Sequence, residues 1–242
     1  MNKANFFWSR TPLLPQQICA LKSFLHHGWD VTFWSLTELS LEIPGVKVRD
    51  ANEILDGSRL GTFRYETCYV DEVVFSDLFR LYVMKHTGGW WFDIDCFCLV
   101  DQFHFNNISY GRDFVACWEV EGTINNSILY FPNQQLLEDY INYVESKIEP
   151  VMSWATIGPV ALTDFMTMRN LQNQALPNNL FYPITWPDAK KSIEDEYTDE
   201  IREKSKHSLT YHWYNSICNL HEFRGYVREL MNKYGGDNYG SS

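Results

Sequence analysis

Two aspartates interrupt an apolar run near the middle of the chain. The run reads GGWWFDIDCFCLV from position 88 to position 100, and Asp93 and Asp95 stand where a buried strand carries hydrophobic side chains. Residues i and i+2 of a strand point to the same face, so both carboxylates can converge on one cation. Oxygen ligands of this kind suit Mg²⁺ or Mn²⁺, which leave coordination positions for water and substrate phosphates. The alternative is a turn that carries two solvated aspartates.

The segment before this run is predicted to be a helix that ends at Gly88 and Gly89. Asp77 interrupts its apolar face, and Arg80 follows three residues later, close enough to share the same surface. An acid and a base on the core-facing side of a helix that leads to D-x-D indicate a functional site. An ion pair at the edge of the core is the alternative. The apolar face consists of Val70, Val73, Val74, Leu78, Leu81 and Tyr82.

The elements that must position these side chains begin with a strand at residues 5–8, a helix at 13–27 and a strand at 31–36. This is a βαβ unit, which predicts a mostly parallel, Rossmann-type sheet flanked by helices, with its ligand site at the carboxyl ends of the strands. Trp8 stands at such an end. Residues 44–60 are polar without a clear period and are predicted to form a loop with one helical turn.

The second half alternates in the same way between apolar and amphipathic segments. The charge-rich stretch 190–206 is predicted to be a solvated surface helix or loop. Strands are predicted at residues 113–120, 127–131, 181–186 and 208–216, and helices at 134–147, 160–169 and 220–234.

The composition fits one globular α/β domain, which we place at residues 1–234, with a flexible tail at 235–242. With 45% hydrophobic and 21% charged residues it is an ordinary globular chain. A net charge of −11 argues against a nucleic-acid partner, which usually requires a basic face.

The chain contains no apolar stretch long enough for a transmembrane segment and no hydrophobic signal region near residue 1, so we expect a cytoplasmic protein. The six cysteines are scattered and are expected to be small buried hydrophobes in a reducing compartment. Cys96-x-Cys98 has no second cysteine pair after it, which argues against a zinc site.

The motif S-D-x-x-R at Ser76, Asp77 and Arg80, followed by GGWWFDID, resembles the signature of the glycosyltransferases whose sugar-binding region contains the D-x-D motif. This family includes the yeast α-1,6-mannosyltransferase-like and capsular polysaccharide sugar transferases and, more distantly, the clostridial glucosylating toxins. The resemblance covers about residues 4–217 and implies a single GT-A-like domain. It also implies catalytic roles for Asp95, Asp77 and Arg80.

The resemblance implies that Asp93 and Asp95 hold Mn²⁺ or Mg²⁺. His212 would be the third ligand in its neutral form, because H-x-x-x-S at residues 212–216 is similar to the closing motif of the family. Without that motif, a histidine in an aromatic strand is more often a hydrogen-bonded core residue than a metal ligand.

The donor is implied to be a nucleotide sugar, with UDP favoured over GDP. Trp8 would pack on the base, an acidic residue (Glu119 or Glu121) and Asn126 would face the sugar and acceptor, and T-x-G-P at residues 156–159 is a further match. A bare turn explains the asparagine and the Gly-Pro pair equally well. The implied donor-binding residues are Trp8, Ser76, Asp77, Arg80, Trp91, Asp93 and Asn126.

These features predict a metal-dependent transferase that moves a hexose to a glycan or a lipid-linked saccharide in polysaccharide biosynthesis. The resemblance implies retention of the anomeric configuration, and since the sequence shows no committed nucleophile, front-face attack by the acceptor is the hypothesis. A nucleotide-sugar hydrolase and a nucleotide-sugar-binding module without turnover are the alternatives.

Overall fold

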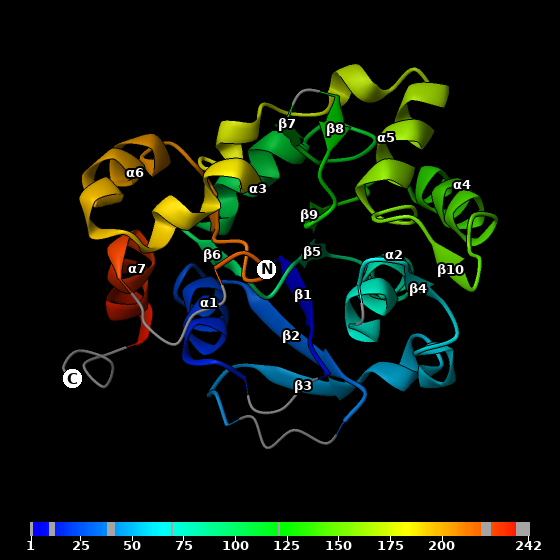
Figure 1. Cartoon of the computed structure of the whole chain (residues 1–242), viewed down its shortest axis with the longest axis horizontal. Coiled ribbons are helices and arrows are strands. Elements are labelled where there is room, and N and C mark those ends of the chain that lie inside the picture. Colours follow the sequence, from blue (N-terminus) through cyan, green and yellow to red (C-terminus); the bar gives the residue numbers. More distant parts are fainter. Residues whose placement is uncertain are drawn as a thin grey trace.

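A five-stranded sheet lies at the centre of the molecule (Figure 1). The computed structural model describes residues 2–9, 13–37, 42–68, 70–120, 122–218 and 224–235. All neighbouring strands of the sheet are parallel except the last pair, so the predicted α/β class with a mostly parallel sheet is confirmed. In spatial order the strands are β3 (Lys47–Asp50), β2 (Asp30–Ser35), β1 (Lys3–Phe7), β5 (Trp90–Phe92) and β9 (Ile128–Leu129).

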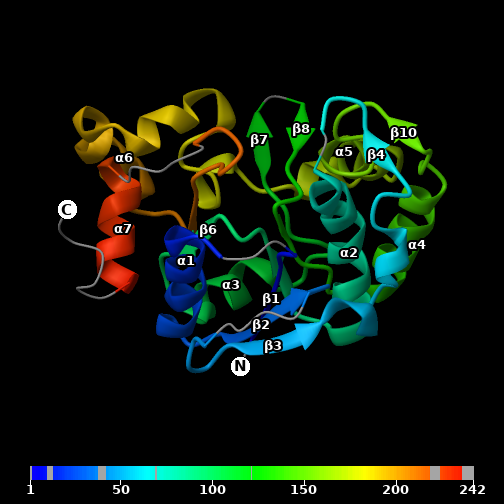
Figure 2. The same ribbon diagram turned by 60° about the horizontal axis from the view of Figure 1, so that its bottom comes forward.

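Helices cover both faces of this sheet (Figures 1 and 2). Neighbouring residues of β1 point to opposite faces. The Phe6 ring therefore packs 4.9 Å from Phe24, and the Phe7 ring packs 4.9 Å from Phe79 on the other side. One face is covered by α1 (Pro15–His26) and α3 (Gln102–Ser109), with α7 (Gly225–Gly235) packed on α1, and the other by α2 (Asp71–Thr87), α4 (Gln134–Glu145) and α5 (Pro159–Met168).

The D-x-D segment does not continue β5 as a strand, which corrects the sequence analysis. β5 ends at Phe92, and the carbonyl oxygen of Asp93 accepts the backbone N–H of Cys96 at 3.1 Å, which closes a turn. After the turn, β6 (Cys96–Cys98) leaves the central sheet and pairs antiparallel with β11 (Thr210–His212). Asp93 and Asp95 therefore lie in a turn between two strands, and their alternation along one strand was the wrong premise.

Two other element predictions were wrong. The segment 44–60 contains β3, a strand whose four residues are all exposed and therefore carry no apolar alternation to predict it. It also contains two short 3₁₀ helices, Ala51–Glu53 and Gly57–Arg59. Residues 181–186 are not a strand but follow the 3₁₀ helix Asn178–Leu180 and lead into the 3₁₀ helix Trp186–Ile193.

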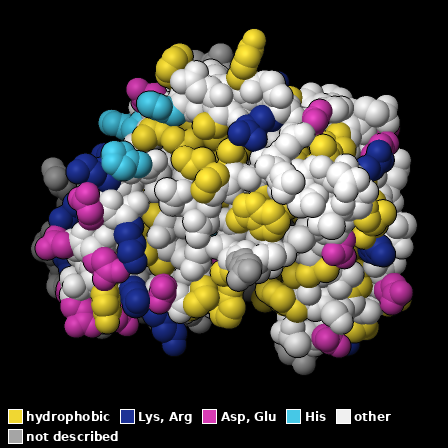
Figure 3. Space-filling view, turned by 90° about the horizontal axis from the view of Figure 1, so that it is seen from above, with side chains coloured by type: hydrophobic (Ala, Val, Ile, Leu, Met, Phe, Trp, Pro, Cys, Tyr) yellow, Lys and Arg dark blue, Asp and Glu magenta, His cyan; other side chains and the backbone are white. Residues whose placement is uncertain are grey.

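Short pairs of strands and a charged surface complete the fold. β4 (Arg64–Tyr65) pairs with β10 (Val151–Met152), and β7 (Trp118–Val120) pairs with β8 (Thr123–Ile124). The stretch 190–206 is a surface segment as predicted: it runs from the 3₁₀ helix at residues 186–193 through a further 3₁₀ turn, Asp195–Tyr197, to α6 (Thr198–Ser205). Seen from above, acidic and basic side chains gather on the side where α6 and α7 lie (Figure 3). Arg202 of α6 and Glu229 of α7 pair there.

None of the described helices is long and apolar enough to cross a membrane. The predicted tail falls outside the described residues except for Gly235, the last residue of α7. The first residues of the predicted helix 220–234 also fall outside them, and the described part begins at Gly225. The domain limits stay a prediction.

Gly89 allows the tight turn between α2 and β5, and Gly89→Ala tests whether a glycine is required there. Its φ is +85°, and a Cβ there would lie 2.6 Å from Cβ of Lys3 and 2.8 Å from its carbonyl oxygen. Gly111 has a similar φ of +71° but open space around it. We expect Gly111→Ala to cost about 1–2 kcal/mol of left-handed strain, and Gly89→Ala to cost a further ~1–3 kcal/mol from the clash. Urea unfolding measures both, and equal losses would contradict the steric argument.

Candidate active site

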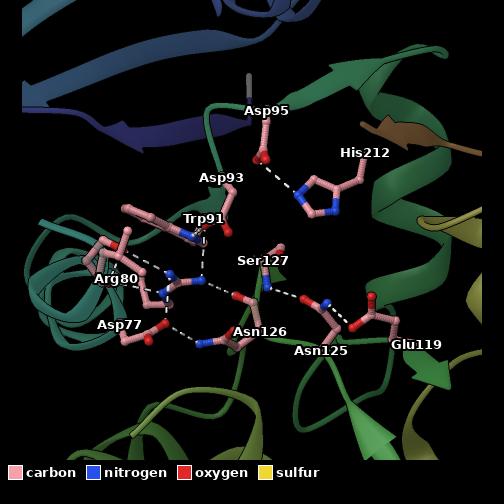
Figure 4. A network of polar contacts seen from close by, with 12 residues as sticks. Asp77, Arg80, Trp91, Asp93, Asp95, Glu119, Asn125, Asn126, Ser127 and His212 are labelled. Carbon is pink, nitrogen blue, oxygen red and sulfur yellow. Dashed lines mark hydrogen bonds and ion pairs between the residues drawn. The ribbon is translucent and has the colours of Figure 1, made fainter. Parts of the chain in front are cut away.

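The candidate site lies where β1 and β5 end, the edge at which open α/β sheets bind ligands (Figure 4). Trp8 follows β1, and its backbone N–H donates to the carbonyl oxygen of Trp34 at 3.1 Å. Asp93 follows β5, and its backbone N–H donates to the carbonyl oxygen of Ser127 at 2.8 Å. The sheet thus brings the D-x-D turn, α2 and the segment before β9 together.

Arg80 of α2 lies between two carboxylates. Its side chain is 3% exposed, and it forms ion pairs with Asp77 (Nη2 to Oδ1, 2.9 Å) and with Asp93 (Nη1 to Oδ1, 3.0 Å). Burial alone would lower the pKa of Arg80, but Asp93 and Asp77 outweigh it and raise the pKa, so the guanidinium stays charged.

The remaining contacts of Arg80 hold it in one orientation. Nη1 donates to the carbonyl oxygen of Asn126 at 2.6 Å, and Nε donates to the carbonyl oxygen of Ser76 at 3.0 Å. The Ser76 hydroxyl accepts a further hydrogen bond from Nη2 at 3.2 Å. The guanidinium lies 5.0 Å from the ring centre of Trp91, a cation–π contact. The predicted acid and base on α2 are therefore parts of one network.

Both carboxylate oxygens of Asp77 are engaged. Oδ1 accepts from Asn126 Nδ2 at 2.8 Å beside its ion pair with Arg80, and Oδ2 accepts from the Tyr65 hydroxyl at 2.7 Å. Gly158 lies directly against the carboxylate, since a Cβ at that position would come within 2.9 Å of Oδ2. The glycine of the T-x-G-P motif thus makes room for Asp77.

The two aspartates of the D-x-D turn face different partners. Oδ1 of Asp93 accepts from the Trp91 indole N–H at 2.7 Å in addition to its pairing with Arg80. Oδ1 of Asp95 lies 2.9 Å from Nε2 of His212, and its Oδ2 accepts the backbone N–H of Asn215 at 2.9 Å. Their side chains are 25% and 15% exposed. Asp93 is therefore tied to α2, and Asp95 to β11.

The pKa values of the two carboxylates shift in opposite directions. Burial raises the pKa of Asp93, and the repulsion of Asp95 adds to it, although Arg80 works against the change. Burial also acts on Asp95, but His212 and the Asn215 N–H outweigh it and lower the pKa of Asp95. For His212, burial acts to lower the pKa, and Asp95 more than offsets it and raises the pKa. Both shifts thus favour the charged form of the group concerned, as expected for an ion pair between Asp95 and His212.

The donor set fits a divalent cation. Asp95 and His212 meet from two different segments, and the second ring nitrogen of His212, Nδ1, is buried without a hydrogen-bond partner among the described residues. The carboxyl of Asp93 is close enough to affect both groups electrostatically. Within the described part of the chain, the group of possible ligand atoms that lie within 4.8 Å of one another comprises Asp95, Cys96 and His212 rather than Asp93. The metal roles of Asp93, Asp95 and His212 stay predictions.

A second branch of the network leads from the site toward β7. Asn125 Nδ2 donates to Oε2 of Glu119 at 2.6 Å, and Asn125 Oδ1 accepts the backbone N–H of Ser127 at 2.6 Å. The carboxyl of Glu119 also acts on Tyr214, whose pKa is raised by burial and by Glu119. The alternative candidate Glu121 lies outside the described residues.

The predicted donor-binding residues fall into two groups according to their position in the site. Ser76, Trp91 and Asn126 contact Arg80, Asp93 or Asp77, so they position those side chains, and their contact with a donor stays a prediction. Trp8 is half-buried at the end of β1, and its indole N–H has no partner in the part of the chain that the structure describes.

The sequence analysis missed several members of the network. Tyr65 belongs to none of the motifs in the sequence, and its hydroxyl contacts Asp77 from 12 residues away. Asn215 contributes its backbone N–H rather than its side chain, so its residue type gave no signal in the sequence. Asn125 was visible as half of the Asn-Asn pair before Ser127, and this pair was the available signal.

Solved structures show which class of protein this is: the chain has the GT-A glycosyltransferase fold. It matches the galactosyltransferase LgtC in complex with donor and acceptor sugar analogues, with a TM-score of 0.57 and 11% identity over 98% of both chains. It matches the apo form of the glycosyltransferase GlyE of Streptococcus pneumoniae TIGR4 with a TM-score of 0.56 and 13% identity, over 96% of this chain and 60% of that one. At such identities the likeness concerns the fold alone.

The sequence families identify the class more narrowly. The family described as glycosyltransferase sugar-binding region containing DXD motif matches residues 16–114, and the alpha 1,4-glycosyltransferase conserved region matches residues 132–237. Together the two matches identify the chain as a glycosyltransferase, and the resemblance to the D-x-D-containing glycosyltransferases noted in the sequence is confirmed. No curated protein sequence matches it.

Gly158→Ala tests the support of Asp77. The added Cβ would meet the Asp77 carboxylate at 2.9–3.2 Å, so Asp77 must move away from Asn126 or Tyr65. We expect a loss of about 1–3 kcal/mol in the free energy of unfolding and a loss of donor binding. Urea unfolding and donor titration measure these effects, with Gly111→Ala as the control. Donor binding equal to that of the control variant would contradict a role for this contact.

The Asp95–His212 pair predicts a pH dependence in chelator-treated protein. Because the folded-state pKa of His212 is raised, its stabilisation is present below the unfolded value of about 6.5 and is lost as the pH rises through the folded value. Because the pKa of Asp95 is lowered, its stabilisation is present above an unfolded value of about 3.9 and is lost at lower pH. The melting temperature of wild type relative to His212→Gln should therefore peak between these limits and fall on the alkaline side. A difference that stays constant with pH would exclude an ion pair.

Proposed function

We propose that this glycosyltransferase moves a hexose from a nucleotide-diphosphate sugar, with UDP favoured over GDP, to a glycan or a lipid-linked saccharide. It would use Mn²⁺ or Mg²⁺ and retain the anomeric configuration. The observation that carries the proposal is the convergence of two paired sets, Asp77–Arg80–Asp93 and Asp95–His212, at the carboxyl edge of the sheet. The family match supports the same class of reaction.

Asp93, Asp95 and His212 would hold the metal ion. When bound, the ion acts as a Lewis acid that neutralises the charge developing on the departing nucleoside diphosphate. His212 would bind as a neutral imidazole, so it must first lose the proton that Asp95 stabilises.

Arg80 and Asp77 would orient the donor. Arg80 places a fixed positive charge beside Asp93, so it acts on the phosphate side of the site and holds Asp93 in place. Asp77 is available to sugar hydroxyls through the lone pairs that its three present partners leave free. Ser76, Trp91 and Asn126 would keep the side chains of Arg80, Asp93 and Asp77 in place through their hydrogen bonds. Trp8 would pack on the base, a contact that is worth roughly 1–3 kcal/mol for aromatic side chains.

Both carboxylate oxygens of Asp77 already have partners, and this supports retention by front-face attack. A carboxylate that acts as a covalent nucleophile needs a free oxygen at the anomeric carbon. Oδ1 of Asp77 is held by Arg80 and Asn126, and Oδ2 by Tyr65, in a side chain that is almost fully buried. The acceptor hydroxyl would then attack from the face that the diphosphate leaves.

A pocket beside Glu119 is our candidate for the acceptor. It has a volume of about 450 Å³, and Glu119 belongs both to its wall and, through Asn125, to the polar network of the site. Its polar side chains suit the hydroxyl groups of a saccharide. The lining residues are Trp118, Glu119, Val120, Gly122, Pro177 and Asn178.

Asp95→Ala tests the proposed function. We expect Mn²⁺-dependent thermal stabilisation by UDP-sugars to disappear, because ligand binding to the native state raises the melting temperature by linkage. Transfer should fall by at least about 10²-fold, the usual effect of removing an electrostatic contact to the transition state. Asp199→Ala, at an exposed position of α6, is the matched control.

The products decide between the proposed reaction and its alternatives. A glycosylated acceptor supports transfer, free sugar indicates a hydrolase, and donor binding without release of nucleoside diphosphate indicates a binding module. Transfer at the wild-type rate in Asp95→Ala would refute the assignment of the metal site.

A further inference from the structure

Cys96 and His212 are direct neighbours across two strands. The register of β6 against β11 pairs Cys96 with His212, and residues opposite each other in an antiparallel pair point to the same face with their Cβ atoms about 5 Å apart. Asp95 precedes Cys96 and reaches the same imidazole from the D-x-D turn at 2.9 Å. As a result, one ligand atom from each of Asp95, Cys96 and His212 lies within 4.8 Å of the other two.

The Cys96 thiol distinguishes this group from the proposed Mn²⁺ or Mg²⁺ site, which contains no sulfur ligand. A thiolate, an imidazole and a carboxylate form the ligand set of zinc, with metal–ligand distances of about 2.0–2.3 Å. Soft sulfur ligands select thiophilic dications over hard ones. Cys96 has no role in the proposed transfer reaction, and it is a free thiol.

One further feature of the cluster indicates a ligand. Among the described residues, Nδ1 of His212 has no hydrogen-bond partner, although the residue is only 5% exposed, so the imidazole has binding capacity that the described part of the protein does not use. Asp95 is partly exposed and gives an ion a route into the cluster.

We propose that Asp95, Cys96 and His212 bind Zn²⁺ or a similar thiophilic dication, with the Cys96 thiolate as a ligand, and that this ion competes with Mn²⁺ or Mg²⁺ for Asp95. On binding, the S–H bond breaks, the proton passes to solvent and a sulfur–metal bond forms. Only the competition rests on the proposed function.

Cys98, the second cysteine of the C-x-C pattern, is not a ligand of the proposed site. The Cys98 thiol is turned to the carbonyl oxygen of Val100, at 3.2 Å, and is absent from the cluster of ligand atoms. The sequence analysis argued against zinc at Cys96-x-Cys98, and the proposed site departs from that expectation through Cys96. The partner of Cys96 comes from the other strand, 116 positions away.

Cobalt(II) in place of zinc tests the thiolate directly, because a cobalt–thiolate bond gives an intense sulfur-to-metal charge-transfer band. We expect this band in the metal-free wild type titrated with Co²⁺ and in Cys98→Ala, a variant of an equally buried cysteine on the same strand. The band should be absent in Cys96→Ala. Competition with a chromogenic chelator should show zinc affinity reduced by at least about 10-fold, since even residues behind metal ligands cost 10- to 100-fold.

Wild-type protein alone gives a second measurement if Cys96→Ala does not fold. The cadmium NMR shift of the Cd²⁺-loaded wild type distinguishes sulfur from oxygen and nitrogen ligation, and a shift in the thiolate range is expected. No charge-transfer band in wild type, a band that persists in Cys96→Ala, or a cadmium shift without sulfur would each overturn the proposed site.

The competition is tested separately. Zinc should reduce the Mn²⁺-dependent stabilisation of wild type by a UDP-sugar, and this stabilisation should be retained and become less sensitive to zinc in Cys96→Ala. Equal zinc sensitivity in the two proteins would refute the competition. Failure of UDP-sugars to stabilise wild type at all would count against the proposed function instead, and the cobalt result would stand independently of it.

Discussion

The structure depends on one buried positive charge. Arg80 is almost fully enclosed, and burying a charge costs several kcal/mol unless partners compensate for it. Asp77 and Asp93 provide the opposite charges, and carbonyl oxygens accept from the remaining N–H groups. These partners come from α2, from the end of β5 and from the segment before β9. The guanidinium therefore joins the core of the fold and the candidate site in one network, in which loss of a single partner leaves a charge unpaired.

The turn after β5 gives the two aspartates different partners. Because the chain leaves the central sheet at Asp93, the carboxylates do not lie on one strand face. Asp93 pairs with Arg80 on α2, while Asp95 pairs with His212, 117 residues later on β11. His212 lowers the pKa of Asp95, whereas burial raises the pKa of Asp93 in spite of Arg80. The same turn starts β6, and its pairing with β11 brings the Cys96 thiol beside the imidazole. One change of strand direction thus underlies both the proposed donor site and the proposed zinc site.

The charges of the site suit the reaction that its family carries out. Three carboxylates, Asp77, Asp93 and Asp95, face one guanidinium and one histidine, which leaves negative potential where a dication would bind. A nucleoside diphosphate would in turn need that dication as a counterion. The Glu119–Asn125 branch extends the polar network toward the pocket beside Glu119. In the proposed function, this pocket is the acceptor side of the site.

The sequence by itself determined the features that depend on local periodicity and on residue type. The amphipathic pattern of α2, the Gly88-Gly89 break, the βαβ start and the acid–base pair on the core-facing side of α2 could all be predicted, and so could the family. Only the tertiary structure decided the rest. The exposed strand β3 has no apolar pattern, the turn at Asp93 breaks the two-residue period, and the contacts of Asp77 with Tyr65 and Gly158 join distant segments. The physical reason is that periodicity reports which face of an element is buried, whereas strand register and chain reversal determine which side chains meet there.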